Sequence, residues 1–109
     1  MSTESLDLMQ GTLDVLILRA LTEGPRHGYA VARWVRDRTG GAIEIEDAPL
    51  YKALRRLEQA KCVDAEWGVS ENNRRARFYR LTAKGKKRLQ AEESQWRRYA
   101  SAVFDVLKP

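Results

Sequence analysis

The chain has 109 residues, of which 43% are apolar, and this is enough for one domain with a single modest core. It contains no apolar run long enough to span a bilayer and no signal pattern at its start, so we expect a cytoplasmic protein without a membrane partner. The net charge of +5 is unevenly divided, with 5 Lys/Arg and 8 Asp/Glu in residues 1–50 but 15 and 7 in residues 51–109, which favours a polyanionic partner.

The first predicted element is a helix over residues 6–21 that is apolar on both sides. One side carries the stripe Leu13, Leu16, Ile17, Ala20 and Leu21. Val15 and Leu18 lie on the opposite side. Because a domain this small can cover only one side, we expect a second subunit to cover the other. Gly24-Pro25 ends the helix.

A second helix is predicted over residues 26–39, where Gly40-Gly41 ends it. Its apolar positions are Tyr29, Val31, Trp34 and Val35. In residues 42–46, Ile43 and Ile45 alternate with polar neighbours, which predicts a short strand.

The third predicted helix has a cationic outer face. Asp47 suits its N-cap and Pro49 its first turn. Its apolar face is Leu50, Ala53, Leu54 and Leu57, and the opposite face is Lys52, Arg55, Arg56 and Gln59. Helices two and three then form a helix–turn–helix, with helix three as the recognition helix.

A β-hairpin is predicted next. Residues 63–69 alternate like a half-buried strand, residues 70–74 form a turn in which Asn72-Asn73 tolerates left-handed backbone, and residues 77–81 return with Tyr79 and Leu81 inward. Helix–turn–helix followed by this hairpin is a winged helix whose tip carries Arg74 and Arg75. Trp34 and Trp67 are interpreted as core residues.

Thr82 is a suitable N-cap for a last helix of about 25 residues, roughly 38 Å long. Leu89, Trp96, Ala100, Val103 and Leu107 recur along it at coiled-coil-like spacings, with Phe104 beside them. We therefore expect a mainly helical fold with a small β-wing. Residues 1–81 would form the winged helix and residues 82–109 a dimerisation helix, together making one structural unit.

Several motifs in order resemble the PadR-type transcriptional regulators of bacteria. They are Gln10-Gly11-Thr12-Leu13 with Leu16-Ile17-Leu18, Gly24-Pro25-Arg26-His27-Gly28-Tyr29, Leu50-Tyr51-Lys52-Ala53-Leu54 with Arg56-Leu57-Glu58, and Trp67 with Arg77-Phe78-Tyr79-Arg80-Leu81-Thr82 and Gly85. The resemblance implies a homodimeric winged-helix repressor of the subgroup with a single C-terminal helix. This chain has Lys52 where that family commonly has Pro, and Lys61 where it commonly has Gly.

The predicted contacts with double-stranded DNA come from the recognition helix and the wing. They are Tyr51, Lys52, Arg55, Arg56, Gln59, Arg74, Arg75 and Arg77. Arg, Lys and Gln read base edges in the major groove, and wing arginines suit the minor groove or the adjacent backbone. The resemblance implies that the Tyr51 hydroxyl donates a hydrogen bond to a DNA phosphate, with packing in the core as the alternative. A charged face exposed only to water is the alternative, and for the cations at residues 84–88 the sequence favours neither interpretation.

The predicted dimer contacts are Val15, Leu18, Leu89, Trp96, Ala100, Val103, Phe104 and Leu107. Some members of the resembling family bind flat aromatic compounds at that interface, which makes Trp96 a candidate for stacking on a small aromatic effector. Simple packing in the dimer core is the alternative.

The sequence offers no basis for an enzyme, a metal site or a cofactor. Cys62 and His27 are the only Cys and His, so neither a disulfide within the chain nor a zinc set can be built, and no Gly-rich phosphate loop is present. Cys62 is interpreted as a buried thiol and His27 as structural. A sequence-specific repressor on a roughly palindromic operator is the expectation. A protein-interaction module docking an acidic partner and a non-specific DNA-binding protein remain as alternatives.

Overall fold

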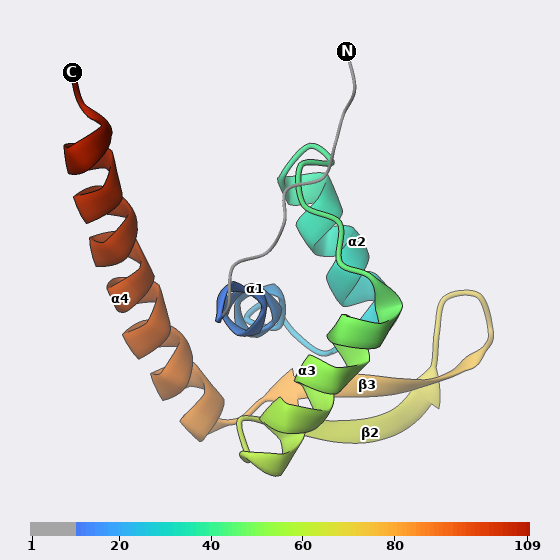
Figure 1. Ribbon diagram of the computed structural model, residues 1–109. Helices are drawn as coiled ribbons and strands as arrows, with labels where there is room; N and C mark the ends of the chain where they lie inside the picture. The colour runs from blue at the N-terminus through green and yellow to red at the C-terminus, as the bar shows by residue number, and fades with distance from the viewer. Residues whose placement is uncertain (1–10) are drawn as a thin grey trace.

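The computed structural model describes residues 11–109, which form a mainly helical fold around a small antiparallel sheet (Figure 1). The elements in order are α1 (Thr12–Ala20), β1 (Arg26–His27), α2 (Gly28–Arg38), α3 (Asp47–Gln59), β2 (Val63–Val69), β3 (Arg75–Leu81) and α4 (Ala83–Leu107). This confirms the predicted winged helix with a long last helix.

The sheet has the strand order β1-β3-β2, and both pairings are antiparallel. The hairpin pairs Val63 with Leu81 at its base and Val69 with Arg75 at its tip. Asn73 in the connecting turn has φ of 58°, so the predicted left-handed residue is confirmed. Figure 1 shows this hairpin projecting from the body as a wing.

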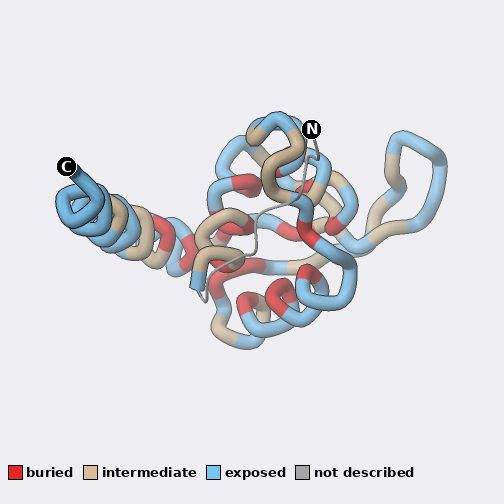
Figure 2. Tube along the Cα trace, turned by 45° about the horizontal axis from the view of Figure 1, so that its top comes forward, coloured by how far each residue is buried: buried red, intermediate tan, exposed pale blue. Residues whose placement is uncertain are grey.

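The core lies where α1, α2 and α3 converge on the base of the sheet (Figure 2). Ile17, Leu18, Leu50, Leu54 and Leu57 are fully buried. Because burying one such side chain contributes about 1.5–3 kcal/mol, these helices are held mainly by apolar contact. The predicted apolar face of α3 is confirmed, as is the buried thiol of Cys62.

Helix starts differ from the sequence prediction by a few residues. The helix α1 begins at Thr12, after Gly11 with φ of 87°, and the predicted start over residues 6–10 lies outside the described residues. The helix α2 begins at Gly28, because the Nδ1 atom of His27 accepts a hydrogen bond from the Ala30 N–H at 3.2 Å. His27 is therefore the N-cap, which confirms its structural role.

The predicted strand over residues 42–46 is wrong, and a strand occurs instead at β1. Strand β3 is paired with β2 on one edge and with β1 on the other, so no edge of β3 is left for residues 42–46. Ile45 is still buried, which accounts for the apolar alternation without a strand. Asp47 is the first residue of α3 rather than its N-cap, which is Glu46.

The prediction that Trp67 is a core residue is also wrong. Trp67 is 58% exposed because it lies toward the tip of β2, beyond the helices that cover the base of the sheet. The guanidinium of Arg75 lies 4.8 Å from the centre of its indole ring. Trp34, by contrast, packs against the core as predicted and is partly buried.

The helix α4 begins as predicted, with the Thr82 hydroxyl accepting the Gly85 N–H at 3.0 Å. Leu89 is buried, and α4 then runs away from the body, so that its last turns stand apart (Figures 1 and 2). Within residues 11–109, no helix has both the length and the apolar character needed to cross a membrane.

Candidate nucleic-acid interface

The outer face of α3 presents two cations that are free of internal partners. Lys52 and Arg55 are exposed, and none of the ion pairs formed within residues 11–109 involves either side chain. Gln59 is exposed one turn further along the same face. Their apolar neighbours on the opposite side of α3 are fully buried, so the core fixes which way this face points.

Tyr51 lies at the edge of this face and packs over the start of α2. A Cβ atom placed on Gly28 would come within 2.7 Å of the Tyr51 hydroxyl oxygen, so only glycine permits this approach. Tyr51 as a whole is 47% exposed. The structure thus gives a physical reason for glycine at position 28, where Tyr51 of α3 packs closely against the start of α2.

Arg56 does not belong with Lys52 and Arg55, although the sequence placed them together. Its NH2 atom lies 2.7 Å from the Oδ1 atom of Asp14 on α1. Arg56 is on the flank of α3 that faces α1, which the helical pattern of α3 alone could not reveal. Arg56 thus differs from Lys52 and Arg55 in being paired within the chain.

The three wing arginines have three different surroundings. Arg74 is exposed in the turn and forms no ion pair within the described part of the chain. Arg75 covers Trp67. The NH2 atom of Arg77 lies 2.8 Å from the Oε2 atom of Glu58 on α3, so this ion pair joins the wing to the recognition helix. Arg77 therefore holds the wing against α3, and Arg74 is left as the free cation at the tip.

Trp67 is a candidate that the sequence interpretation missed. Antiparallel pairing puts Trp67 opposite Arg77, on the same face of the hairpin as Arg75. An exposed indole beside two guanidinium groups can pack on sugar or base surfaces while the cations meet phosphate. The strand pattern alone could have predicted its direction but not its exposure, which depends on how far β2 extends past the helices.

Two side chains in this region have shifted pKa values. Burial raises the pKa of the Tyr79 phenol on strand β3. The hydrogen bond from Arg88 to Glu92 raises the pKa of the Arg88 guanidinium. Arg88 is thus bound inside the subunit, whereas Lys84, Lys86 and Lys87 are exposed at the start of α4.

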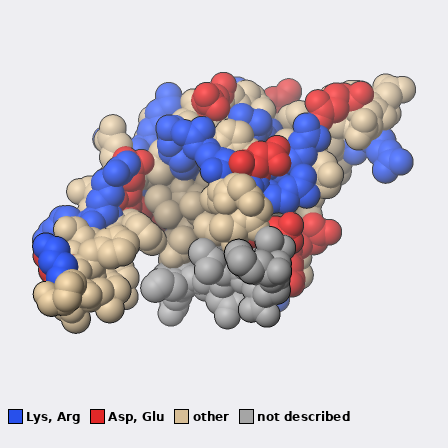
Figure 3. Space-filling view, turned by 90° about the horizontal axis from the view of Figure 1, so that it is seen from above, with Lys and Arg blue, Asp and Glu red and all other residues tan. Residues whose placement is uncertain are grey.

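Of the eight residues predicted to form a dimer contact, Val15 is half-buried on α1, and the other seven divide into two groups. Trp96, Val103, Phe104 and Leu107 are exposed on the far part of α4, and Ala100 is half-buried among them. Leu18 and Leu89 are buried inside the subunit, which corrects their assignment to a partner-facing surface. Tyr99 and Val106 are exposed apolar residues that the predicted stripe omitted. Figure 3 shows uncharged side chains gathered at the end of α4.

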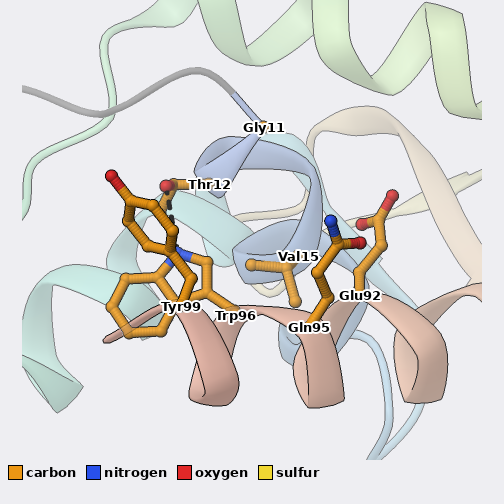
Figure 4. Close-up of a pocket in the computed structure, with 7 residues that line it drawn as sticks. All are labelled: Gly11, Thr12, Val15, Glu92, Gln95, Trp96 and Tyr99. Atoms are coloured by element: carbon orange, nitrogen blue, oxygen red, sulfur yellow. Dashed lines mark hydrogen bonds between the residues drawn. The ribbon is translucent and has the colours of Figure 1, made fainter. Parts of the chain in front are cut away.

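A cavity of about 490 Å³ lies between the start of α1 and the middle of α4 (Figure 4). Its lining residues are Gly11, Thr12, Val15, Glu92, Gln95, Trp96 and Tyr99. The Trp96 Nε1–H donates to the Thr12 hydroxyl oxygen at 3.3 Å, which sets the edge of the indole against α1. Among residues 11–109, no cluster of His, Cys, Asp and Glu is placed to hold a metal ion.

Comparison with known proteins places this arrangement among regulators. The family described as "Transcriptional regulator PadR-like family" matches residues 17–91. The uncharacterized protein X of Lysinibacillus sphaericus is 32% identical over 90 residues, which are 83% of this chain and 83% of that protein.

Solved structures of regulators have the same fold. A PadR family transcriptional regulator from Eggerthella lenta is 33% identical, with a TM-score of 0.76, and the match covers 91% of this chain and 84% of that one. A transcriptional regulator from Clostridium thermocellum is 28% identical, with a TM-score of 0.79, and the match covers 87% and 92%.

Proposed function

The chain belongs to the PadR-like family of transcriptional regulators, which are DNA-binding proteins and not enzymes, and from this premise we propose that it is a cytoplasmic, homodimeric repressor of a roughly palindromic operator. The observation that carries the proposal is the pair of free cations on α3, Lys52 and Arg55, beside a wing whose tip presents Arg74. Such a surface is complementary to a duplex, because a helix fits the major groove while a wing follows the neighbouring backbone.

The exposed apolar end of α4 supports a homodimer. Phe104 is 67% exposed, and Tyr99, Val106 and Leu107 are exposed around it. A contiguous apolar surface of this kind is unfavourable in water and is typical of an interface. Pairing two copies through α4 covers it, and the two-fold axis then requires two recognition helices about 34 Å apart on one side of the duplex.

Different residues take different parts in DNA binding. Lys52 and Arg55 face the bases and phosphates of the major groove, with Gln59 one turn further along. Tyr51 donates its hydroxyl to a phosphate at the edge of that groove. Arg74 and Trp67 contact the backbone beside the minor groove, while Arg75 and Arg77 hold Trp67 and the wing in place. Phosphate neutralisation dominates the affinity, so binding weakens steeply with salt.

The cavity beside Trp96 supports control by a small aromatic effector. Trp96 and Tyr99 supply flat apolar surfaces, and Glu92 and Gln95 supply polar groups at the rim. Pairing through α4 brings two such cavities near the dimer axis. A ligand held there releases the operator if it binds better to a dimer whose recognition helices are no longer correctly spaced.

The test is in vitro selection from a random DNA pool, followed by titration of the winning duplex and a scrambled duplex at two salt concentrations. We expect a palindrome bound about 10³-fold more tightly than the scrambled control. Binding of both duplexes with equal affinity would instead indicate a non-specific DNA-binding protein. No binding near 50 mM salt would favour the docking of an acidic protein.

Two matched double variants test whether the outer face of α3 binds the DNA. Replacing both Lys52 and Arg55 by Ala removes two charges from α3, and we expect the palindrome preference to disappear. Replacing both Arg97 and Lys108 by Ala removes two charges from the exposed side of α4, where each pairs only with a residue of the same helix or its end. The second variant is expected to retain the preference, and equal loss in both would contradict the proposed interface.

A further inference from the structure

Asp14 is the one buried carboxylate found within residues 11–109, and both of its oxygens are bound. It is 8% exposed, in the first turn of α1. Its Oδ1 atom lies 2.7 Å from Arg56 of α3, and its Oδ2 atom lies 3.1 Å from Arg88 of α4. A single side chain of α1 therefore binds both the recognition helix and the helix proposed to form the dimer.

The bridge continues along α4. The Nε atom of Arg88 lies 2.8 Å from the Oε1 atom of Glu92, one turn further along. Arg88 therefore uses different atoms of its guanidinium for Asp14 and for Glu92, which fixes the orientation of the group as well as its position. We name the set Asp14, Arg56, Arg88 and Glu92 the three-helix bridge.

A second connection joins the same two helices at their near ends. The Thr82 hydroxyl donates to the Lys61 carbonyl oxygen at 2.6 Å, and the Thr82 N–H donates to the Cys62 carbonyl oxygen at 3.1 Å. The end of α3 and the start of α4 are thus pinned at one point. A pinned point leaves the direction of α4 free to pivot, whereas a contact away from that point fixes the direction. The three-helix bridge supplies such a contact, in addition to buried Leu89 and the hydrogen bond from Trp96 to Thr12 further along α4.

The charges of the three-helix bridge favour one arrangement, in which Asp14 keeps both of its cations. A buried carboxylate that loses one cation is left partly uncompensated in a low-dielectric site, so the arrangement with both cations in place is strongly preferred. The side chain of Arg56 is 59% exposed, so water can replace Asp14 as its partner. Asp14 is buried, so water cannot replace Arg56 in the same way. With both cations bound, Asp14 adds a charged restraint on the angle between α3 and α4 to the apolar contacts that hold α3.

We propose that Asp14 is a positioning residue for DNA binding, which fixes the angle between α3 and α4 and so sets the half-site spacing that the dimer accepts. This inference rests on the proposed homodimer, because the angle matters to DNA only when two copies pair through α4. The projecting length of α4 amplifies any change of angle at the bridge into a displacement of the partner's recognition helix.

The experiment uses the full chain and a DNA library in which two copies of the selected half-site are separated by spacers of different length. The wild-type protein is expected to prefer one spacing by about tenfold, because each added base pair rotates the half-sites by about a tenth of a turn. With Asp14→Asn, which keeps the shape but removes the charge, we expect the preference to fall to about twofold or less while the same half-site sequence is still selected.

Two further variants keep the test decisive. Arg56→Gln breaks only the α3 end of the bridge at a largely exposed side chain, so it is expected to fold even if Asp14→Asn does not, and to broaden the spacing preference in the same direction. Arg97→Gln breaks an exposed pair with Glu93 on the same helix α4 and serves as the control that leaves the spacing unchanged.

The outcomes are distinguishable. If the wild-type protein selects a spaced palindrome and both bridge variants keep its sharp spacing, with or without a lower melting temperature, Asp14 is merely structural and the inference is overturned alone. If the wild-type protein selects no paired half-sites, the homodimeric repressor itself is wrong, and the role of Asp14 falls with it.

Discussion

In the first part of α4, residues 83–92, Gly85 and Leu89 are buried against the body of the subunit, whereas in the last part, residues 96–107, Phe104 and Leu107 are exposed to solvent. Both parts belong to one continuous helix with apolar residues at helical spacing. The first part finds a surface of its own subunit to cover its apolar side. In the last part Trp96 still hydrogen-bonds to Thr12, but Phe104, Val106 and Leu107 find no such surface within residues 11–109.

One sequence pattern can therefore serve two purposes within one helix. An apolar stripe reports only that a surface must be covered, and the fold decides whether the same chain or another molecule covers it. Changes in the first part should therefore act on folding. Changes in the last part should act on association while the winged helix stays folded.

Gly85→Ala should have the largest effect and should act on folding. The added Cβ would lie 2.0 Å from the Cys62 carbonyl oxygen, a backbone atom that cannot move aside without shifting the start of β2. We expect a loss of several kcal/mol in the free energy of unfolding, despite the better helix propensity of Ala. Urea denaturation followed by circular dichroism measures it.

The control for that substitution is Lys86→Ala, one residue along at an exposed position of the same turn. It should change the free energy of unfolding by less than about 0.5 kcal/mol. If Gly85→Ala were as stable as this control, the close approach of α4 to Cys62 would be contradicted.

Phe104→Glu should break association and spare the fold. A carboxylate at an apolar interface must be desolvated on pairing, so we expect the dimer to weaken by about 2 kcal/mol or more, roughly a thirtyfold change in its dissociation constant. Sedimentation equilibrium measures this change. The far-ultraviolet circular dichroism of the monomer should remain helical, and a loss of helical signal without a change in mass would contradict the division of α4 into two parts.

Thr82→Ala tests the joint between α3 and α4 with a smaller expected effect. The substitution removes the cap on the Gly85 N–H and the hydrogen bond to the Lys61 carbonyl. We expect a loss of about 1–2 kcal/mol in the free energy of unfolding. Thr82→Ser keeps both hydrogen bonds and should recover most of this loss. Equal stability of the Ala and Ser variants would show that the joint contributes little.

Lys61→Gly should have the smallest effect and should stabilise the protein. Lys61 has φ of 65°, and the Cys62 N–H donates to the Leu57 carbonyl oxygen at 2.9 Å, so Lys61 occupies the helix-ending position that favours glycine. We expect a gain of about 0.5–1 kcal/mol, measured by thermal unfolding. Asn73→Gly, at φ of 58°, should gain less because Asn tolerates left-handed backbone, and a larger gain at Asn73 would contradict this explanation.

The sequence by itself determined the helices, the hairpin and the family resemblance. Helical periodicity, Thr82 as a cap and the Asn73 turn are local features, because each depends on residues within a few positions along the chain. The outward direction of Lys52 and Arg55 was predictable for the same reason, since the buried face of α3 fixes the exposed one.

Only the tertiary structure decided which of these surfaces stay exposed and which charges stay free. Trp67 alternates like a core residue but lies beyond the helices. Leu18 was predicted to contact a partner but is buried inside its own chain. Arg56 lies on the same helix as Lys52 but is bound to Asp14. These outcomes depend on residues far apart in the sequence, such as Asp14 and Arg88, which no local pattern brings together. Periodicity gives the direction of a side chain, but only packing determines what it meets there.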